Sequence, residues 1–300
     1  MASYVKGMII VLIAGTLWGF SGTCAQFLFQ DYGITPIYLT NLRMVTAGLI
    51  LVGIAVLKYR QNFINMLKDR KDLALLFSFA FLGILFNQLS YLMAISYTNS
   101  GTATILQYVG PVLIMVVSCF IEKRLPNKKE ITALILVMIG VWLLATHGDF
   151  NSLYITPKGL LWGLLSAVAC VFYTMMPVRL IKKHGSIPVV GTGMLFGGMG
   201  LTLFNRFQGG PEVYDQRYLT YIAVIVILGT VIPYTAYLLG ISLCGAVKGS
   251  MIASIEPVSA TVCMVLWLGE SFYAIDLAGF ICIFLTVFLL AKHEGEAKRE

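Results

Sequence analysis

The strongest chemical signal in the sequence is a carboxylate followed directly by a proline inside a long apolar stretch. Glu256 and Pro257 lie near the middle of residues 246–270, AVKGSMIASIEPVSATVCMVLWLGE. A carboxylate in hydrocarbon costs a few kcal/mol or more unless it faces protein or water, so Glu256 marks a candidate site. It could bind and release a proton, or pair with a cationic ligand. Alternatively, it satisfies backbone amides that the kink at Pro257 leaves free.

A weaker copy of this stretch lies upstream at residues 102–122, TATILQYVGPVLIMVVSCFIE. Pro111 takes the place of Pro257 there, and Gly110 stands where the later copy has Glu256. A proline inside a helix removes a hydrogen bond and bends the axis, so both segments are predicted to kink. We expect Pro111 and Pro257 to act as hinges of any gating movement.

A further group of candidates consists of amide and aromatic side chains inside apolar stretches. We predict that they contact a ligand: Trp18, Asn87, Gln88, Tyr91, Gln107, Tyr108, Tyr173, Tyr234 and Tyr237. Amide groups are costly in lipid without partners, so the three amides must face protein or water. An aromatic, weakly charged cavity suits a small amphipathic ligand through apolar contact or cation–π attraction. For any single tyrosine, core packing or a belt at the membrane interface is the alternative.

Arg43 is a cation within the apolar run at residues 36–57. Its five donors could clamp the carboxylate of a ligand. It could instead bind carbonyl groups of a neighbouring helix, or extend its charged end to the membrane interface. The surrounding residues leave these roles open.

The elements that carry these candidates must be membrane-spanning helices. Of the 300 residues, 58% are hydrophobic and only 12% are charged, which is more apolar side chain than a soluble core can bury. The apolar residues occur in runs of about 20, the length at which a helix crosses ~30 Å of hydrocarbon. The first run, residues 8–29, has no small-residue cleavage site after it and is interpreted as a span, not a signal peptide.

We predict ten spans joined by short connections. They cover residues 7–29, 36–57, 73–95, 101–121, 130–146, 158–180, 188–206, 218–240, 246–268 and 274–291. Most Lys and Arg residues in the connections fall on one side, and only Lys158, Arg206 and Arg217 fall on the other. Because basic loops stay in the cytoplasm, both termini are expected to be cytoplasmic. The net charge of +7 is assigned to this asymmetry, and no nucleic-acid partner is expected.

No motif for a metal, a cofactor or catalysis is visible. Five of the six cysteines fall in predicted spans, Cys244 falls between two of them, and none forms a C-x-x-C pair. The three histidines fall at helix ends or in loops. The cysteines are interpreted as small apolar packing residues. No H-E-x-x-H, nucleophile elbow or phosphate loop occurs. We therefore expect no cofactor, no metal site and no enzymatic activity.

The two halves of the sequence, residues 1–150 and 151–300, repeat one another. Matched pairs at an offset of 152, then of 146, include Gly33 and Gly185, Pro36 and Pro188, and Leu82-Gly83 and Leu228-Gly229. Five spans in each half is an odd number, so the second half enters the membrane from the opposite side. The predicted fold is an all-α membrane protein with ten transmembrane helices in two inverted five-helix repeats. Secondary transporters use this architecture and bind substrate near the midplane between the halves.

These features resemble the EamA family of the drug/metabolite transporter superfamily, whose members are ten-helix bundles of two inverted repeats. The matching motifs are Leu17-Trp18-Gly19, Asn41-Leu42-Arg43, Glu256-Pro257 and Gly269-Glu270. The first half departs from the pattern, because Gly110-Pro111 lacks the glutamate and Ile121-Glu122 replaces Gly-Glu. The resemblance implies that the helices carrying the aromatic and amide candidates surround a central cavity. It also favours a structural role for Arg43, which matches an arginine shared by members with different substrates.

The resemblance implies a secondary active transporter in the cytoplasmic membrane, for small metabolites, amino acids or amphipathic drugs. We expect export by alternating access, coupled to protons at Glu256, with a small-molecule substrate and the lipid bilayer as partners. Import of a small organic nutrient, such as a quaternary amine, is the alternative, and an intramembrane enzyme or a channel is a more distant one. Gly15 and Gly19 permit close helix approach, which we interpret as packing within a monomer, with a weak homodimer as the alternative.

Overall fold

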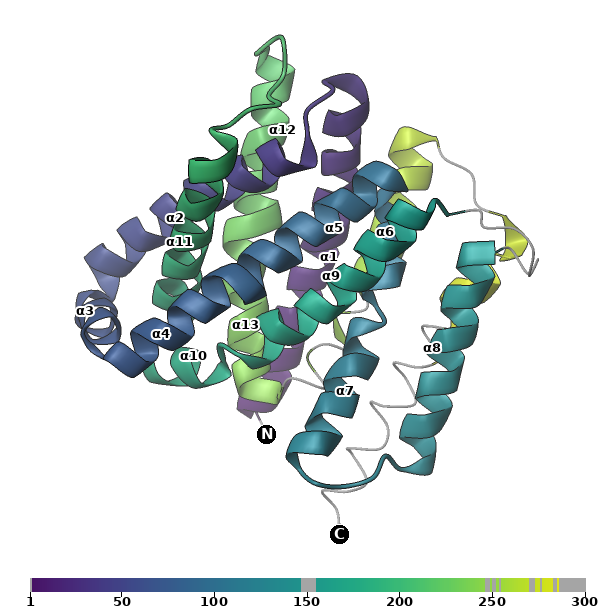
Figure 1. Ribbon diagram of the computed structural model, residues 1–300, viewed down its shortest axis with the longest axis horizontal. Helices are drawn as coiled ribbons and strands as arrows, with labels where there is room; N and C mark the ends of the chain where they lie inside the picture. Colours follow the sequence, from purple (N-terminus) through teal and green to yellow (C-terminus); the bar gives the residue numbers. More distant parts are fainter. Residues whose placement is uncertain are drawn as a thin grey trace.

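The structure is a computed structural model that describes residues 2–146, 155–245, 249, 252–253, 255–269, 273–275, 277–282 and 285. Within these residues every regular element is a helix, and the helices lie side by side as a bundle (Figure 1). The predicted all-helical architecture is therefore confirmed for the described part of the chain.

The first half of the chain begins with the long helix at the N-terminus. Its elements are α1 (Ala2–Asp31), α2 (Pro36–Lys58), α3 (Arg60–Lys68), α4 (Arg70–Ser78), η1 (Phe79–Leu85), α5 (Phe86–Tyr97), α6 (Ser100–Gln107), α7 (Gly110–Ile121) and α8 (Lys128–Thr146). Polar side chains define where helices begin: Thr35 accepts the backbone N–H of Tyr38 at the start of α2, and Asp69 accepts that of Lys71 at the start of α4. Such caps satisfy backbone donors that have no partner inside the helix.

The second half of the chain is also helical where the structure describes it. Its elements are α9 (Pro157–Met175), α10 (Val178–His184), α11 (Ser186–Asn205), α12 (Gln216–Val226), η2 (Ile227–Val231), α13 (Ile232–Cys244), α15 (Ile255–Cys263) and η3 (Met264–Leu268). Thr156 accepts the N–H of Gly159 at the start of α9, and Asp215 accepts that of Tyr218 at the start of α12. These caps again satisfy backbone donors that have no partner inside the helix.

Seven helices in the described part of the chain are long and apolar enough to cross a membrane. They match seven predicted spans: Tyr4–Asp31, Pro36–Lys58, Arg70–Tyr97, Ser100–Ile121, Pro157–His184, Ser186–Asn205 and Gln216–Cys244. The 19-residue α8 covers the predicted fifth span, and the shorter apolar helix Ile255–Leu268 covers the later part of the ninth. Glu270 and half of the predicted tenth span lie outside the described residues. A multi-pass helical membrane protein is thereby confirmed.

Two spans contain a π-helical segment at corresponding positions. The segment η1 lies between α4 and α5, and η2 lies between α12 and α13. Gly83 in η1 and Gly229 in η2 are 146 residues apart, the offset of the sequence repeat. A π-helical turn is wider than an α-helical one and is often found at functional sites. The sequence predicted uninterrupted helices here, because the width of a helical turn leaves no periodic signal in an apolar run.

The predicted kink at Pro111 is a break. The segment α6 ends at Gln107, and α7 begins at Gly110 with Pro111 in its first turn. Proline has no backbone N–H and disfavours helical geometry in the residue before it, so the helix stops ahead of it. Tyr108 therefore lies in a turn inside the bundle, where its side chain is buried.

The helix α1 lies against both α13 and α15, and Gly19 permits the closest of these approaches. A Cβ atom on Gly19 would lie 2.5 Å from the carbonyl oxygen of Glu256 and 2.6 Å from the backbone nitrogen of Ala260. Gly15, one turn earlier, faces the backbone of Ala253 in the same way. The Gly15–Gly19 pair therefore packs within the chain, against the segment that carries Glu256.

Contacts between the halves form a reciprocal pattern. The helix α1 packs against α13, α9 packs against α5, and α2 packs against α11. By the sequence offsets, α1 corresponds to α9 and α5 corresponds to α13. The first two contacts are therefore counterparts, with the roles of the halves exchanged.

Candidate functional site

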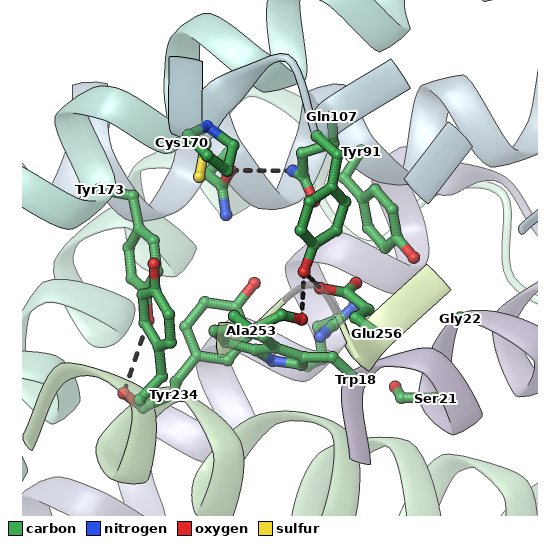
Figure 2. A pocket seen from close by; sticks show the side chains of 15 residues that line it. Trp18, Ser21, Gly22, Tyr91, Gln107, Cys170, Tyr173, Tyr234, Ala253 and Glu256 are labelled. Atoms are coloured by element: carbon green, nitrogen blue, oxygen red, sulfur yellow. Dashed lines mark hydrogen bonds between the residues drawn. The ribbon is translucent and has the colours of Figure 1, made fainter. Parts of the chain in front are cut away.

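A cavity lies between the two halves, and most of the predicted site residues line it (Figure 2). The first half contributes Trp18, Ser21, Gly22, Arg43, Asn87, Tyr91, Gln107, Tyr108 and Pro111. The second half contributes Cys170, Tyr173, Tyr234, Tyr237, Ala253 and Glu256. The broken helix of the first half and the start of α15 thus meet at one place.

Glu256 is a buried carboxylate on the wall of this cavity, with 5% of its surface exposed. The hydroxyl of Tyr108 donates a hydrogen bond to the carbonyl oxygen of Ala253 and lies 3.5 Å from Oε2 of Glu256. A phenol from the break between α6 and α7 therefore bridges to the second half. Because one hydroxyl carries one hydrogen, the carboxylate keeps capacity to accept a proton or a cation from the cavity.

Arg43 is buried where α2 meets the π-helical segment η2. Its Nε donates to Oγ1 of Thr230 at 3.0 Å, and an Nη donates to the carbonyl oxygen of Gly229 at 3.1 Å. Its guanidinium also lies 5.9 Å from the ring centroid of Tyr234. The wide turn of η2 presents this carbonyl to Arg43. Arg43 thus binds a neighbouring helix, one of the three roles considered for it, and it faces the cavity as well.

The two buried charges on the cavity wall have opposite signs. Arg43 reaches it from the first half and Glu256 from the second, and no ion pair joins them directly within the described residues. A cavity that is negative at one point and positive at another complements a ligand with both charges.

Four aromatic residues form a wall of the cavity. The indole centroid of Trp18 lies 5.0 Å from that of Tyr234 and 4.9 Å from that of Tyr237. Tyr173 stacks on Tyr237 at 5.7 Å with 12° between the ring planes. These separations are typical of packed aromatic pairs. The rings therefore support one another as a wall and do not enclose a separate cation-sized gap.

The two adjacent amides on α5 have different surroundings. Asn87 lines the cavity and accepts a hydrogen bond from Nε2 of Gln107 at 3.2 Å. Gln88 is fully buried but is not among the residues that line the cavity, and its amide atoms have no hydrogen-bond partner in the described structure. Neighbours on a helix point about 100° apart, so the two amides meet different surroundings.

Four lining residues were not among the predicted candidates, and one predicted hinge lies elsewhere. Ser21, Gly22, Cys170 and Ala253 line the cavity, whereas Pro257 does not. Helical spacing offered a signal for three of them, since Ser21 and Gly22 lie three and four residues after Trp18, and Cys170 lies three before Tyr173. Ala253 contributes its backbone carbonyl, which no residue type can signal.

The cavity is narrow in this structure. It leaves about 50 Å³ for the centres of water-sized molecules, enough for a few waters. A ligand of amino-acid size requires its walls to move apart. The described residues contain no group of three or more His, Cys, Asp or Glu side chains that could hold a metal ion.

The sequence matches the model of the EamA-like transporter family over residues 5–146 and again over residues 157–292. Together the two ranges cover most of the chain, which therefore belongs to this family.

Individual relatives are also transporters by name. The chain is 37% identical over 291 residues to the uncharacterized inner membrane transporter YicL of Salmonella typhimurium, covering 97% of both chains. It is 25% identical over 278 residues to the threonine/homoserine exporter RhtA of Salmonella typhimurium, covering 92% of this chain and 88% of the relative. It is also 25% identical over 272 residues to RhtA of Escherichia coli strain K12, covering 90% and 86%. A crystal structure of another protein shares the fold, with a TM-score of 0.68, 15% identity and coverage of 97% of this chain and 98% of the other. The protein is thus a multi-pass membrane transporter.

Proposed function

We propose that this transporter carries a small zwitterionic metabolite of the amino-acid class through the cavity by alternating access. The observation that supports it is the pair of buried, opposite charges on one cavity wall, Arg43 from the first half and Glu256 from the second. A substrate ammonium would approach Glu256, and its carboxylate would approach Arg43. The aromatic wall and the amides would contact the remaining atoms.

The mechanism that we propose uses two inverted five-helix repeats, residues 1–150 and 151–300, with both termini in the cytoplasm. The reciprocal helix contacts, the paired π-helical segments and the two ranges of the family match all support this division. Two similar halves can exchange conformations, so states open to either side have similar energies. The breaks near Pro111 and before Pro257 would be the points of movement.

We further propose that protons drive the transport through Glu256. It is a buried carboxylate at the cavity wall, and a carboxyl group can carry one proton across with each cycle. Movement outward is the direction that we favour, because the relatives named RhtA are exporters. Import of a quaternary amine is less well supported, since the four packed rings leave no separate cage and Arg43 would repel a permanent cation.

The test is counterflow and pH-gradient-driven flux in proteoliposomes. L-threonine and L-homoserine are the first substrates to measure, followed by other amino acids, amines and drugs. Wild-type protein should exchange at least one zwitterion, and an imposed pH gradient should accelerate its flux. Glu256→Gln keeps the shape of the side chain but cannot release a proton, so it should abolish the acceleration. Glu122→Gln is the matched control, because Glu122 is an exposed carboxylate beside Arg124. Absence of counterflow for every compound tested would overturn the proposal, and an unchanged pH response in Glu256→Gln would overturn the role of Glu256.

A further inference from the structure

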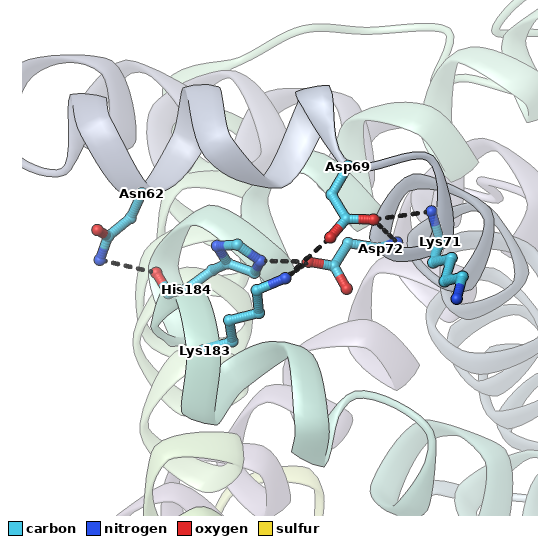
Figure 3. A network of polar contacts seen from close by, with 6 residues as sticks. All are labelled: Asn62, Asp69, Lys71, Asp72, Lys183 and His184. Atoms are coloured by element: carbon cyan, nitrogen blue, oxygen red, sulfur yellow. Dashed lines mark hydrogen bonds and ion pairs between the residues drawn. The ribbon is translucent and has the colours of Figure 1, made fainter.

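A cluster of charged side chains joins the two halves at the face of the bundle where the N-terminus lies (Figures 1 and 3). We call Asp69, Asp72, Lys183 and His184 the N-face cluster. Nε2 of His184 lies 2.6 Å from Oδ2 of Asp72, and Nζ of Lys183 lies 2.6 Å from the same oxygen. Lys183 also lies 3.0 Å from Oδ2 of Asp69. These contacts tie the start of α4, in the first half, to the end of α10, in the second.

The N-face cluster is anchored in the protein. Asp72 and His184 are 2% and 3% exposed, so the contact between them is shielded from water. The amide of Asn62, on α3, donates to the backbone carbonyl of His184 at 3.4 Å. The first half therefore holds His184 by its ring and by its backbone.

A second contact joins the halves at the opposite face. The hydroxyl of Tyr32, just after α1, lies 2.8 Å from Oδ1 and 3.0 Å from Oδ2 of Asp215, to which it donates. The rings of Tyr32 and Tyr218 pack with centroids 5.5 Å apart. The N–H of Thr35 donates to the carbonyl of Gly209 at 2.9 Å. We call Tyr32, Asp215 and Tyr218 the far-face contact.

The helix ends that enter these two contacts correspond in the sequence repeat. His184 stands 152 residues after Tyr32, the offset that relates the first spans of the two halves. Each directly precedes a glycine with positive φ, Gly33 at 61° and Gly185 at 89°. The chain therefore turns in the left-handed region after both residues, which favours glycine.

The residues that contact these two helix ends also correspond in the sequence repeat. Asp215 stands 146 residues after Asp69, and each is the N-cap of the helix that follows it. Asp72 and Tyr218, which face His184 and Tyr32, are also 146 residues apart. At the N-terminal face, the end of α10 thus contacts the start of α4, which Asp69 caps. At the opposite face, the end of α1 contacts the start of α12, which Asp215 caps.

We propose that the N-face cluster and the far-face contact are the two gates of the transport cycle. Each must break before the cavity can open to its own face, and both are made in this structure together with a narrow cavity. The inference rests on the proposed function in one respect, which is that the cavity opens to two faces in turn. These residues position the halves and do not touch the substrate.

The two gates differ in chemistry at equivalent positions. The N-face cluster sets an ammonium and an imidazole against two carboxylates, whereas the far-face contact sets one phenol against one carboxylate. Hydrogen bonds between charged groups are stronger than those with a neutral donor. The empty carrier should therefore open more readily at the far face. Substitutions in each gate should shift the population toward opening at that face alone.

Cys170 offers a probe of both openings because it lines the cavity. In a protein in which the other cysteines are replaced by alanine, a membrane-impermeant maleimide is added to one side of sealed, oriented vesicles. Asp72→Asn or Lys183→Met should accelerate labelling of Cys170 from the N-terminal face by roughly tenfold, the effect of losing a hydrogen bond to a charged group. Tyr32→Phe should accelerate labelling from the far face by a smaller factor, and labelling from the N-terminal face should not rise.

Matched control substitutions distinguish an effect on one gate from a general loss of packing in the protein. Lys182→Met removes a neighbouring exposed lysine and Asp31→Asn removes an exposed carboxylate beside Tyr32, and both should leave the rates unchanged. Lys183→Arg keeps the charge and should restore slow labelling. Each variant is required to elute as one species and to label fully after denaturation. Unchanged rates in all gate variants, or faster labelling from both faces in each, would overturn the proposal. Labelling needs no substrate, so this failure is distinct from an absence of flux.

Discussion

The two halves each have a proline near the start of a helix beside the cavity, with different chemistry around it. In the first half the helix breaks at Tyr108 and Val109 before Pro111, and in the second half Glu256 and Pro257 begin α15. The first wall presents a phenol and amides, and the second presents a carboxylate and the carbonyl of Ala253. The proline near a helix start is thus common to both halves, whereas the carboxylate belongs to one.

Around the cavity, the first half supplies the hydrogen-bond donors to the second half. Tyr108 donates from the first half to the second, and Arg43 of the first half donates to η2 of the second. A movement of one half against the other must change these bonds. Substitutions in either half should therefore affect the part of the cavity that contains Glu256.

The largest effect is expected where α1 supports the second wall. In Gly19→Ala the added methyl would lie 2.5 Å from the carbonyl oxygen of Glu256, so α15 must shift, at a cost of about 3 kcal/mol. Thermal unfolding in detergent should show a clear loss of stability, and flux should fall. Gly53→Ala is the control, because nothing lies within 4 Å of a Cβ there and alanine favours a helix by about 1 kcal/mol. Equal effects of the two substitutions would contradict the close approach.

The next effect concerns the bond from α2 to η2. Arg43→Lys keeps the charge but cannot reach Thr230 and Gly229 with a planar pair of donors, and should cost about 2 kcal/mol. The unfolding temperature should fall while the affinity for a zwitterion changes little. A large loss of affinity with unchanged stability would instead show that Arg43 acts mainly on the substrate.

A smaller effect is expected for the phenol between the walls. Tyr108→Phe removes the donor to Ala253 and the contact with Glu256, and should cost about 1 kcal/mol. Tyr38→Phe is the comparison, because the Tyr38 hydroxyl bonds that of Tyr218 and neither residue lines the cavity. Only Tyr108→Phe should alter the pH dependence of flux, and a similar change in both variants would argue against a specific link to Glu256.

The smallest effect concerns stability against pH at the N-face cluster. The hydrogen bond from Lys183, followed by backbone N–H bonds, lowers the pKa of Asp69 from 3.8 to about 2. A carboxylate with a lowered pKa stabilises the fold above its ordinary pKa, and this stabilisation is lost as the pH falls toward the lowered value. The stability difference between wild type and Asp69→Asn should thus be constant above pH 5 and shrink between about pH 4 and 2. It should be small, because the ion pair is half-exposed. A stability difference between wild type and Asp69→Asn that grows as the pH falls would contradict this prediction.

Sequence patterns were sufficient to place most helices and to nominate most of the residues around the cavity. Long apolar runs predict spans because a helix must fill the hydrocarbon thickness, and polar groups within them must turn inward. They could not separate Asn87 from Gln88, since both are amides and their direction depends on how α5 is rotated. They also gave no sign of η1 and η2, whose extra width arises from packing.

What the sequence determined by itself is a helical membrane protein with a repeated plan and a buried acid at Glu256. These follow from local chemistry, namely apolar length, proline geometry and the cost of a charge in lipid. The tertiary structure decided which partners meet, such as Tyr108 with Ala253 and His184 with Asp72. Such pairs lie more than a hundred residues apart, and no spacing within one helix can specify them. Only the packing of one half against the other brings them together.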